Sequence, residues 1–333
     1  MAALGILGIG LPVQADGTAG GATETMLVME ALGDALVAEP YLDTVVIGGG
    51  LLKRVGGNQV RQLLSSIAIG KSRIALASGE PTSRYSSSSV RTTARYEDGW
   101  WILDGAKSVV HSAPTATHLV VTARTSGNEH DHHGVSLFLI DRDTPGVTTH
   151  DYKLIDGHEA SDLIFDGVRV GNEALLGEQD QSGGLLELVL DEAVAALCAE
   201  AVGIMRCMLN HTVTYLGQRR QFGQPLATFQ ALQHRVADMY VALSRASSAV
   251  YLITFKLDAS PSIRARAASA AKATIAETGE FIGENAIQLH GGVGMTNDLE
   301  IGHYFRRLTV IQSSLGSRSF HLARYAKEHA LTP

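Results

Sequence analysis

The chain has 333 residues, with 27 Lys or Arg against 34 Asp or Glu, so its formal net charge is -7. A chain with this balance has no general basic field to hold a phosphate backbone, which argues against a nucleic-acid partner. With 45% hydrophobic and 18% charged residues, the composition is that of a globular protein and not of a disordered one. The length predicts two or three domains or layers.

The two cysteines, Cys198 and Cys207, fall within a segment of helical character. They form neither a disulfide framework nor a Cys-x-x-Cys metal or redox pair, which indicates a reducing compartment. The apolar start, Met1–Val13, lacks the charged n-region of a signal peptide, and no run in the sequence approaches the ~18 to 20 apolar residues of a membrane span. We therefore expect a soluble, cytoplasmic protein with no membrane contact.

Helical periodicity marks the first part of the chain. Apolar residues recur at helical spacing over residues 24–36 and again over residues 59–69. The glycine groups Gly48–Gly50 and Gly56–Gly57 are expected to break the helical stretches. We predict an N-terminal helical domain over residues 1–72.

Short runs of β-branched and aromatic residues fill the middle of the chain, between about residues 74 and 170, with Asp-Gly, Pro-Gly and Asn-rich turns between them. No helical segment separates these runs, which favours a small antiparallel barrel or sandwich over a parallel sheet. We predict a middle antiparallel β-barrel domain over residues 73–178.

Long segments rich in Ala, Leu, Met and Arg follow Gly184. Short connections between consecutive long helices imply an antiparallel bundle. We predict a C-terminal four-helix bundle over residues 179–333. The helices are expected at residues 185–218, 228–257, 262–289 and 319–329, and the fold class is α+β multidomain.

The polar loop Glu129–His133 contains three histidines, an aspartate and a glutamate, which are metal-type ligands. Histidines in a polar hairpin loop that lacks apolar residues nearby are more often solvated than metal-bound. We expect a surface loop here and no metal site.

Two stretches in the last third are harder to explain by packing alone. In Gln218–Leu226 a helix ends and Arg219, Phe222 and a glycine come together before Pro225. In Ala286–Thr296 a helix ends in a glycine-rich turn, which permits positive φ and the close approach of a backbone or a diphosphate. Arginine beside such a turn suits phosphate. Either stretch by itself is also explained by an ordinary glycine C-cap and a surface arginine.

Together, the R-x-x-F-G of the first stretch and the Q-x-x-G-G-x-G of the second resemble the acyl-CoA dehydrogenase family. Further matching motifs run along the chain, among them Glu80-Pro81, Asp104-Gly-Ala-Lys107, Phe165-Asp-Gly-Val-Arg-Val170 and Leu175-Leu-Gly177. The resemblance covers roughly residues 1–330 and implies the same order of helical domain, β domain and bundle. It also implies FAD between the β domain and the bundle, with the ADP half of each FAD reaching a neighbouring subunit.

The resemblance implies roles for individual residues. Arg219 and Phe222 match the family positions that meet the diphosphate and adenine region of the partner's flavin, and the other matching positions belong to the same nucleotide-holding group. The implied cofactor-binding residues are Arg219, Phe222, Gln230, Gln288, Gly291 and Gly292.

The catalytic position departs from the family pattern. The family reaction removes the α-proton of an acyl-CoA thioester with a glutamate while the β-hydride passes to flavin N5. The resemblance places Leu315 at the position of this base, and leucine cannot accept a proton. A minority of relatives hold the base on the first bundle helix, where this chain has Ala193. Glu192 is adjacent, but one residue turns the side chain about 100° around a regular helix.

The flavin-facing strand is altered as well. Lys107-Ser-Val-Val-His111 stands where the family has Lys-x-Trp-Ile-Thr, and Ala77-Ser-Gly-Glu-Pro81 lacks the usual threonine before Glu-Pro. Every change falls on the half-site that faces the flavin ring and carries the base, whereas the nucleotide-holding half is intact. The pattern therefore resembles the small, non-catalytic subunits of heteromeric acyl-CoA dehydrogenases that act on pimeloyl-CoA or steroid side chains.

The resulting hypothesis is a subunit of an FAD-dependent acyl-CoA dehydrogenase that completes the FAD site of a homologous subunit bearing the catalytic glutamate. The family implies acyl-CoA as substrate and electron-transfer flavoprotein as electron acceptor. Two alternatives stay open: a self-sufficient homo-oligomeric enzyme with Glu192 as a displaced base, and a flavin-free acyl-CoA-binding or scaffold protein. The start of the chain matches an internal family segment, so we also expect a shortened N-terminal domain.

Overall fold

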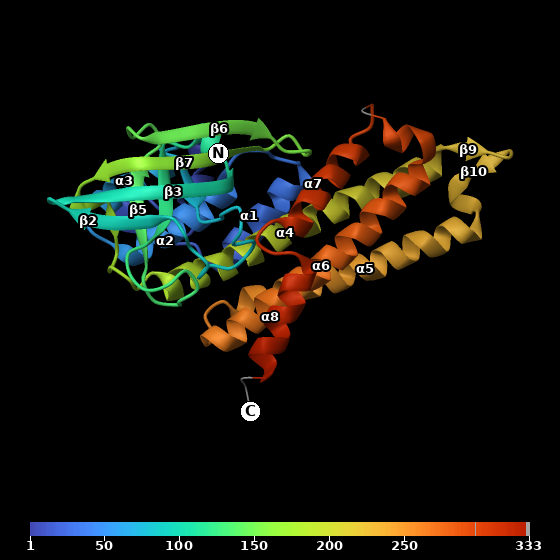
Figure 1. Cartoon of the computed structure of the whole chain (residues 1–333). Coiled ribbons are helices and arrows are strands. Elements are labelled where there is room, and N and C mark those ends of the chain that lie inside the picture. The colour runs from blue at the N-terminus through green and yellow to red at the C-terminus, as the bar shows by residue number, and fades with distance from the viewer. Residues whose placement is uncertain (297, 331–333) are drawn as a thin grey trace. The chain divides into compact units, whose positions relative to one another are not determined.

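The computed structural model describes residues 1–296 and 298–330 (Figure 1). The chain follows the predicted order of helical start, β sheet and helical bundle. Contacts group it into two compact units, the first formed by Met1–Gly21 with Ala38–Ala193 and the second by Ala22–Val37 with Val194–Pro333. The division into three domains at residues 72/73 and 178/179 stays a prediction, and the contact units differ from it by placing residues 22–37 with the bundle.

The first unit begins with three short 3₁₀ segments and a helical layer. The layer comprises a π-helical turn at Leu42–Gly48, α2 (Gly49–Val55) and α3 (Asn58–Ala68). Gly56 and Gly57 separate α2 from α3 with φ values of 74° and 100°, which confirms the break predicted there. The helix predicted over residues 59–69 is confirmed as α3.

The break predicted at Gly48–Gly50 is wrong, because the π-helical turn runs directly through these glycines into α2. Tight packing explains why glycines stand at these positions. A Cβ on Gly48 would lie 2.5 Å from Cβ of Ile74, and a Cβ on Gly49 would lie 2.7 Å from a methyl group of Leu11. These glycines are therefore needed for close approach of a continuous helix, and not for a turn.

The strands of the first unit form one eight-stranded sheet in the order β6-β7-β3-β2-β4-β5-β8, with β1 paired to β4. Both the β1–β4 and the β2–β4 pairings are parallel, which corrects the expectation of an all-antiparallel sheet, and the pairings do not confirm closure into a barrel. The strands are β1 (Ile74–Ala77), β2 (Thr93–Glu97), β3 (Trp100–His111), β4 (His118–Arg124), β5 (Val135–Asp141), β6 (Val147–Lys153), β7 (Glu159–Val170) and β8 (Leu175–Leu176).

One face of this sheet buries an apolar core. Trp101, Leu103, Leu119, Phe138 and Phe165 belong to it, and each is at most 4% exposed. The rings of Trp101 and Phe138 meet edge to face with their centroids 5.3 Å apart, an arrangement that aromatic pairs prefer. The short β-branched and aromatic runs that predicted strands here supply the residues of this core.

The second unit is a helical bundle whose long helices were predicted. Helices α5 and α6 run side by side, and α6 also packs against α7 and α8 (Figure 1). No helix within the described residues combines the length and apolarity that a bilayer-spanning segment needs. The helices are α1 (Ala22–Asp34), α4 (Gly183–Gln218), α5 (Gln230–Lys256), α6 (Pro261–His290), α7 (Ile301–Ser313) and α8 (Arg318–Ala330), and the short hairpin of β9 (Arg220–Gln221) and β10 (Gln224–Pro225) joins α4 to α5.

Helix α1 joins the bundle through a backbone contact with α4. A Cβ on Gly33 would lie 2.0 Å from the carbonyl oxygen of Glu200, and a Cβ on Gly203 would lie 2.0 Å from the carbonyl oxygen of Glu30. Two glycines, one on each helix, thus allow the two backbones to touch. The Arg206 guanidinium forms an ion pair with the Glu30 carboxylate beside this contact, and Tyr304 donates a hydrogen bond to the Asp34 carbonyl at 2.8 Å.

We expect Gly203→Ala to lower the free energy of unfolding by about 1–3 kcal/mol, because the added methyl group forces the two backbones apart. Gly217→Ala on the same helix is the matched control, since a Cβ there meets no atom within 4 Å. Alanine favours helix at such a site, so the control should be neutral or more stable by up to about 1 kcal/mol. Chemical denaturation of both variants measures the difference. Equal stability of the two would show that α1 does not depend on this contact.

Candidate functional site

A cavity of about 760 Å³ lies in the second unit, where α4 and α6 end. Four of the six predicted nucleotide-binding residues line it: Arg219, Gln288, Gly291 and Gly292. The two stretches that stood out in the sequence are therefore brought together in space. No acidic residue is among the described residues that line the cavity, so its charge comes from Arg219 and from Arg235.

The end of α6 shapes one wall of this cavity. Gly291 caps the helix with a φ of 66°, and its N–H bonds to the carbonyls of Gln288 and Ile287. A Cβ on Gly291 or on Gly292 would meet no atom within 4 Å, and both residues are exposed. The absent side chains thus leave bare backbone facing open space, which a diphosphate can approach closely.

Two aromatic rings form another part of the lining. The rings of Tyr215 on α4 and His290 on α6 stack with centroids 4.5 Å apart and planes inclined by 27°. Nδ1 of His290 lies 2.8 Å from the carbonyl oxygen of Ala286, so it carries the proton and donates it. Burial lowers the pKa of His290 below its ordinary value, which keeps the ring neutral at pH 7 and leaves the arginines as the cations of the cavity. Sequence reasoning missed this ring pair: His290 stands in the glycine-rich stretch already singled out, but its stacking partner Tyr215 lies far from it along the chain.

Phe222 and Gln230, the other two predicted residues, are not among the cavity-lining residues. Phe222 lies at the tip of the β9–β10 hairpin with a φ of 52° and is 89% exposed. Its ring meets only the edge of Phe229, at 6.1 Å between centroids. Gln230 begins α5 and is exposed. The left-handed backbone at Phe222 thus leaves its phenyl ring in solvent in this chain.

Leu315, at the predicted base position, lies in the turn between α7 and α8. It is half-buried and has a φ of 54°, a conformation that non-glycine residues adopt rarely. The turn, Ser314–Ser317, contains no ionisable side chain. It therefore offers no proton acceptor at the position where the family pattern places one.

Glu192, the alternative base, lies in the part of α4 that belongs to the first unit. Arg54 of α2 holds its carboxylate with two hydrogen bonds, at 3.0 and 2.6 Å. The two side chains are only 20% and 27% exposed. The neighbouring Asp191 and Ala193 are both buried. Glu192 would have to leave this bidentate pair before it could act as a base.

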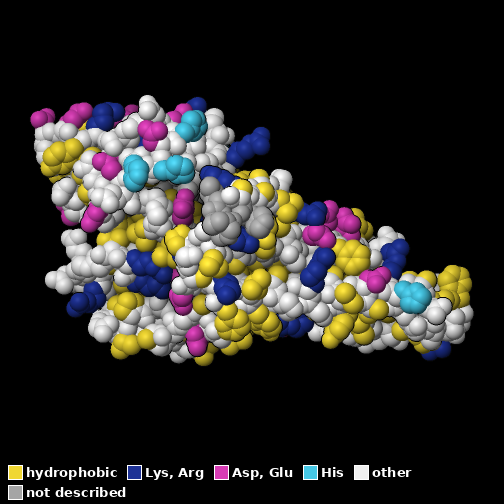
Figure 2. Space-filling view, turned by 90° about the horizontal axis from the view of Figure 1, so that it is seen from below, with side chains coloured by type: hydrophobic (Ala, Val, Ile, Leu, Met, Phe, Trp, Pro, Cys, Tyr) yellow, Lys and Arg dark blue, Asp and Glu magenta, His cyan; other side chains and the backbone are white. Residues whose placement is uncertain are grey.

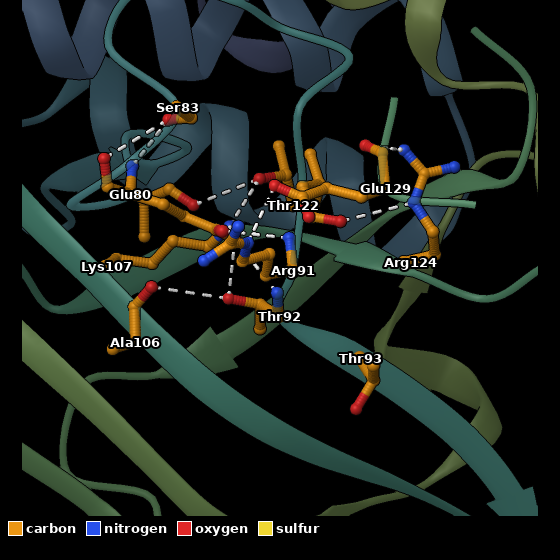
Figure 3. A network of polar contacts seen from close by, with 12 residues as sticks. Glu80, Ser83, Arg91, Thr92, Thr93, Ala106, Lys107, Thr122, Arg124 and Glu129 are labelled. Carbon is orange, nitrogen blue, oxygen red and sulfur yellow. Dashed lines mark hydrogen bonds and ion pairs between the residues drawn. The ribbon is translucent and has the colours of Figure 1, made fainter. Parts of the chain in front are cut away.

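Lys107 and Glu80, from two of the matching motifs, form a buried ion pair beside strand β3 (Figure 3). Nζ of Lys107 lies 2.7 Å from Oε1 of Glu80 and donates a second hydrogen bond to Thr122 at 2.9 Å. The Glu80 carboxylate also accepts bonds from the backbone N–H groups of Thr92 and Arg91, at 3.0 and 2.8 Å. This network fixes the loop of residues 78–92 against the sheet.

The same pair shifts both pKa values. Burial alone would raise the pKa of Glu80, but the Lys107 ammonium and the backbone N–H donors outweigh it and hold this pKa below its ordinary value. Burial lowers the pKa of Lys107 to about 8, against the opposing effect of Glu80. Both groups are therefore charged at neutral pH.

Strand β3 is strained at Val109, where the resemblance predicts a lost tryptophan. The register of β3 against β7 shifts between Lys107 and Val110, and Val109 has a φ of 51° with 49% of its surface exposed. Such a φ is a genuine outlier for a β-branched residue. The backbone N–H groups of Ser108 and Val109 hold the bulge by donating to the Gly79 carbonyl and the Asp162 carboxylate, both at 2.9 Å.

Two family domains match this sequence. The middle domain of the acyl-CoA dehydrogenase family matches residues 75–168, and the C-terminal domain of the same family matches residues 186–329. The 3-(aryl)acrylate reductase of Clostridium sporogenes (strain ATCC 15579) is 30% identical over 317 residues, which are 93% of this chain and 84% of that relative. This chain therefore belongs to the acyl-CoA dehydrogenase family, whose enzymes bind FAD and act on CH–CH bonds.

Solved structures support the same assignment. The chain superposes on one described as "Tcur3481-Tcur3483 steroid ACAD G363A variant" with a TM-score of 0.88 and 30% identity, covering 99% of this chain and 87% of that one. A structure of the ChsE4-ChsE5 complex from Mycobacterium tuberculosis gives a TM-score of 0.89 at 25% identity, with coverage of 100% and 87%. The predicted family, the order of its parts and the oxidoreductase class are thus confirmed.

We expect Glu80→Gln to lower the free energy of unfolding by about 3–5 kcal/mol, because it leaves the Lys107 ammonium buried without a counter-charge. The double variant Glu80→Gln with Lys107→Met should recover a large part of this loss, since the amide still accepts the backbone N–H bonds. Urea denaturation of both variants measures the coupling. A double variant no more stable than the single one would contradict a charge-based role.

The lowered pKa of Glu80 also predicts a pH dependence. A carboxyl group whose pKa is depressed on folding contributes stability above its unfolded value, 4.5 for this glutamate, and loses it as the pH falls through the folded value. We therefore expect the stability difference between wild type and Glu80→Gln to be smaller at pH 3 than at pH 5. Denaturation at a series of pH values tests this; a difference that persists undiminished at pH 3 contradicts it.

Proposed function

We propose that this chain is the non-catalytic subunit of a heteromeric acyl-CoA dehydrogenase. In this proposal it completes the FAD site of a homologous subunit that carries the catalytic glutamate. The observation that carries the proposal is the contrast between its two candidate sites. Arg219, Gln288 and the two exposed glycines converge on one open cavity, whereas leucine stands at position 315, where the resemblance places the base, and Arg54 holds Glu192.

The cavity residues fit the ADP part of FAD. Arg219 supplies a guanidinium for a diphosphate, the Gly291–Gly292 backbone permits close approach, and the cavity has no acidic lining to repel an anion. Phe222, exposed at the hairpin tip, is placed to stack on a base. When bound, FAD supplies the hydride-accepting ring. The residues of this chain would hold and orient the nucleotide end and take no proton from the acyl-CoA.

An exposed apolar face on α5 supports assembly with another subunit. Tyr240, Val241, Tyr251, Leu252 and Phe255 are 46–73% exposed, and their spacing places them along one side of the helix. Figure 2 shows hydrophobic side chains of this kind exposed over the bundle among scattered charged residues. An apolar face of this extent is typical of a protein–protein interface. We propose that a homologous subunit covers it, and that electron-transfer flavoprotein accepts the electrons.

Reconstitution tests the division of roles between the subunits. The chain is purified alone and together with a homologous subunit that carries the glutamate. Flavin absorbance and acyl-CoA-dependent reduction of a dye are then measured for each. We expect turnover only from the complex, with Glu192→Gln leaving its rate unchanged. Stoichiometric flavin and turnover from this chain alone, lost in Glu192→Gln, would establish the self-sufficient enzyme instead. An assembly without flavin would establish the scaffold.

Arg219→Gln in the complex should weaken FAD binding by about 10- to 100-fold, because a charge-assisted hydrogen bond contributes about 1.5–3 kcal/mol and each 1.4 kcal/mol is tenfold. Arg220→Gln is the matched control, since Arg220 is the next residue on the same hairpin and does not line the cavity. Flavin release on dilution, followed by fluorescence, measures both variants. Equal release from the two would place the nucleotide elsewhere.

Gly292→Val should weaken FAD binding without loss of stability. The position is exposed, its φ is not positive, and a Cβ there meets no atom of the chain. A branched side chain would therefore occupy only the space that the nucleotide needs. Thermal unfolding without nucleotide provides the control and should match wild type. Undiminished flavin content in the variant would refute the role of this glycine.

A further inference from the structure

The turn between α7 and α8 is held by two buried side chains that no part of the proposed function uses. Lys272 of α6 is fully buried. Its Nζ lies 2.8 Å from the carbonyl oxygens of Ile311 and Gly316 and 3.2 Å from that of Gln312. An ammonium group has three N–H donors, so these three carbonyls satisfy it completely.

The acceptors explain why a lysine is tolerated here without a carboxylate. Ile311 and Gln312 belong to the last turn of α7, whose carbonyls have no partner within the helix and carry the negative end of the helix dipole. No carboxylate of the described residues forms an ion pair with Lys272. Its charge is thus balanced by backbone dipoles, with the buried Cys198 also nearby, and the carbonyl of Gly316 ties the following turn to the same ammonium.

His321 of α8 holds the turn from the other side. Its Nε2 lies 2.9 Å from the carbonyl oxygen of Leu315, and Nδ1 lies 3.5 Å from Oγ of Ser269 on α6. Burial first, and then the nearby Lys272 and Arg324 charges, lower the pKa of His321 to about 4. The ring is therefore neutral and donates its Nε2 proton to Leu315.

The backbone of the turn fits these two side chains closely. Gly316 has a φ of 115°, and a Cβ on it would lie 2.4 Å from Nε2 of His321. Oγ of Ser317 accepts a hydrogen bond from the N–H of Phe320 at 3.3 Å, as an N-cap of α8 does. Contacts therefore fix the turn at residues 315, 316 and 317, and none of them involves the Leu315 side chain.

We infer that Lys272 and His321 are positioning residues that fix the backbone of the Ser314–Ser317 turn, whatever side chain stands at position 315. The inference rests on the proposed function only in assigning position 315 to the missing base. It explains why leucine adopts a left-handed conformation, since the surrounding contacts over-determine the backbone. It also implies that the turn remains ready to carry a carboxylate, and that the loss of the base involved one side chain and not the loop.

Hydrogen exchange of the full chain tests the inference without any assay of turnover. In Lys272→Met we expect amides of residues 311–321 to exchange at least tenfold faster than in wild type, while those of α5 are unchanged. Leu315→Glu should leave the 311–321 exchange within about twofold of wild type. The inference is overturned if Lys272→Met leaves residues 311–321 protected, if exchange rises equally throughout the bundle, or if Leu315→Glu releases the turn.

Nitrogen NMR of labelled histidine supplies a second readout, which also serves if Lys272→Met does not fold. In wild type and in Leu315→Glu, His321 should keep its proton on Nε2 and stay neutral down to about pH 4. Where Lys272→Met folds, the pKa of His321 should rise, because a neighbouring positive charge has been removed. A His321 that titrates near pH 6.5 in wild type, or that carries its proton on Nδ1, would overturn the inference. These results are independent of whether the subunit reconstitution succeeds.

Discussion

A buried cation is stable only where hydrogen-bond acceptors surround it, and in this protein three buried cations hold segments of irregular backbone in place. Lys107 meets a carboxylate and a hydroxyl group beneath β3. Lys272 meets three carbonyls at the end of α7. Arg124 donates to the carbonyls of Glu129 and His133 in the loop of residues 126–134 and to the carbonyl of Ser88. Side-chain donors thus supply these loops with hydrogen bonds that a strand would obtain from its neighbours.

The sequence predicted the parts of the fold whose signal is local. Long helices such as α4 and α6 follow from long segments rich in Ala and Leu, and the strands around Trp101 and Phe138 follow from short runs of β-branched and aromatic residues. The predictions that failed depend on distant partners. From sequence alone, Gly48–Gly50 indicates a break in a helix. Only the structure shows that Ile74 and Leu11 pack closely against a continuous helix at these glycines. The parallel pairing of β1 with β4 likewise depends on a neighbour far along the chain.

Some residues of the candidate site could be predicted from local sequence, and others could not. Arg219, Gln288, Gly291 and Gly292 could be singled out because each stretch combines residue types that suit phosphate, and the fold brings them to one cavity. Lys272 and His321 could not, because their partners are main-chain carbonyls, which have no signature in the sequence. The Arg54–Glu192 ion pair could not be predicted either, because its two residues lie on helices that are far apart along the chain.

The assignment of α1 to the second unit has a consequence for how the polypeptide is made. Residues 22–37 belong with the bundle although residues on both sides of them belong to the first unit, so neither unit corresponds to one uninterrupted stretch of chain. Glu30 and Arg206, which join α1 to α4, are 176 positions apart. During synthesis α1 must emerge from the ribosome well before the helix that receives it. A gene fragment that ends at residue 193 would therefore contain every residue of the first unit, but it would leave α1 without Glu200 and Gly203, the residues of α4 that its backbone touches.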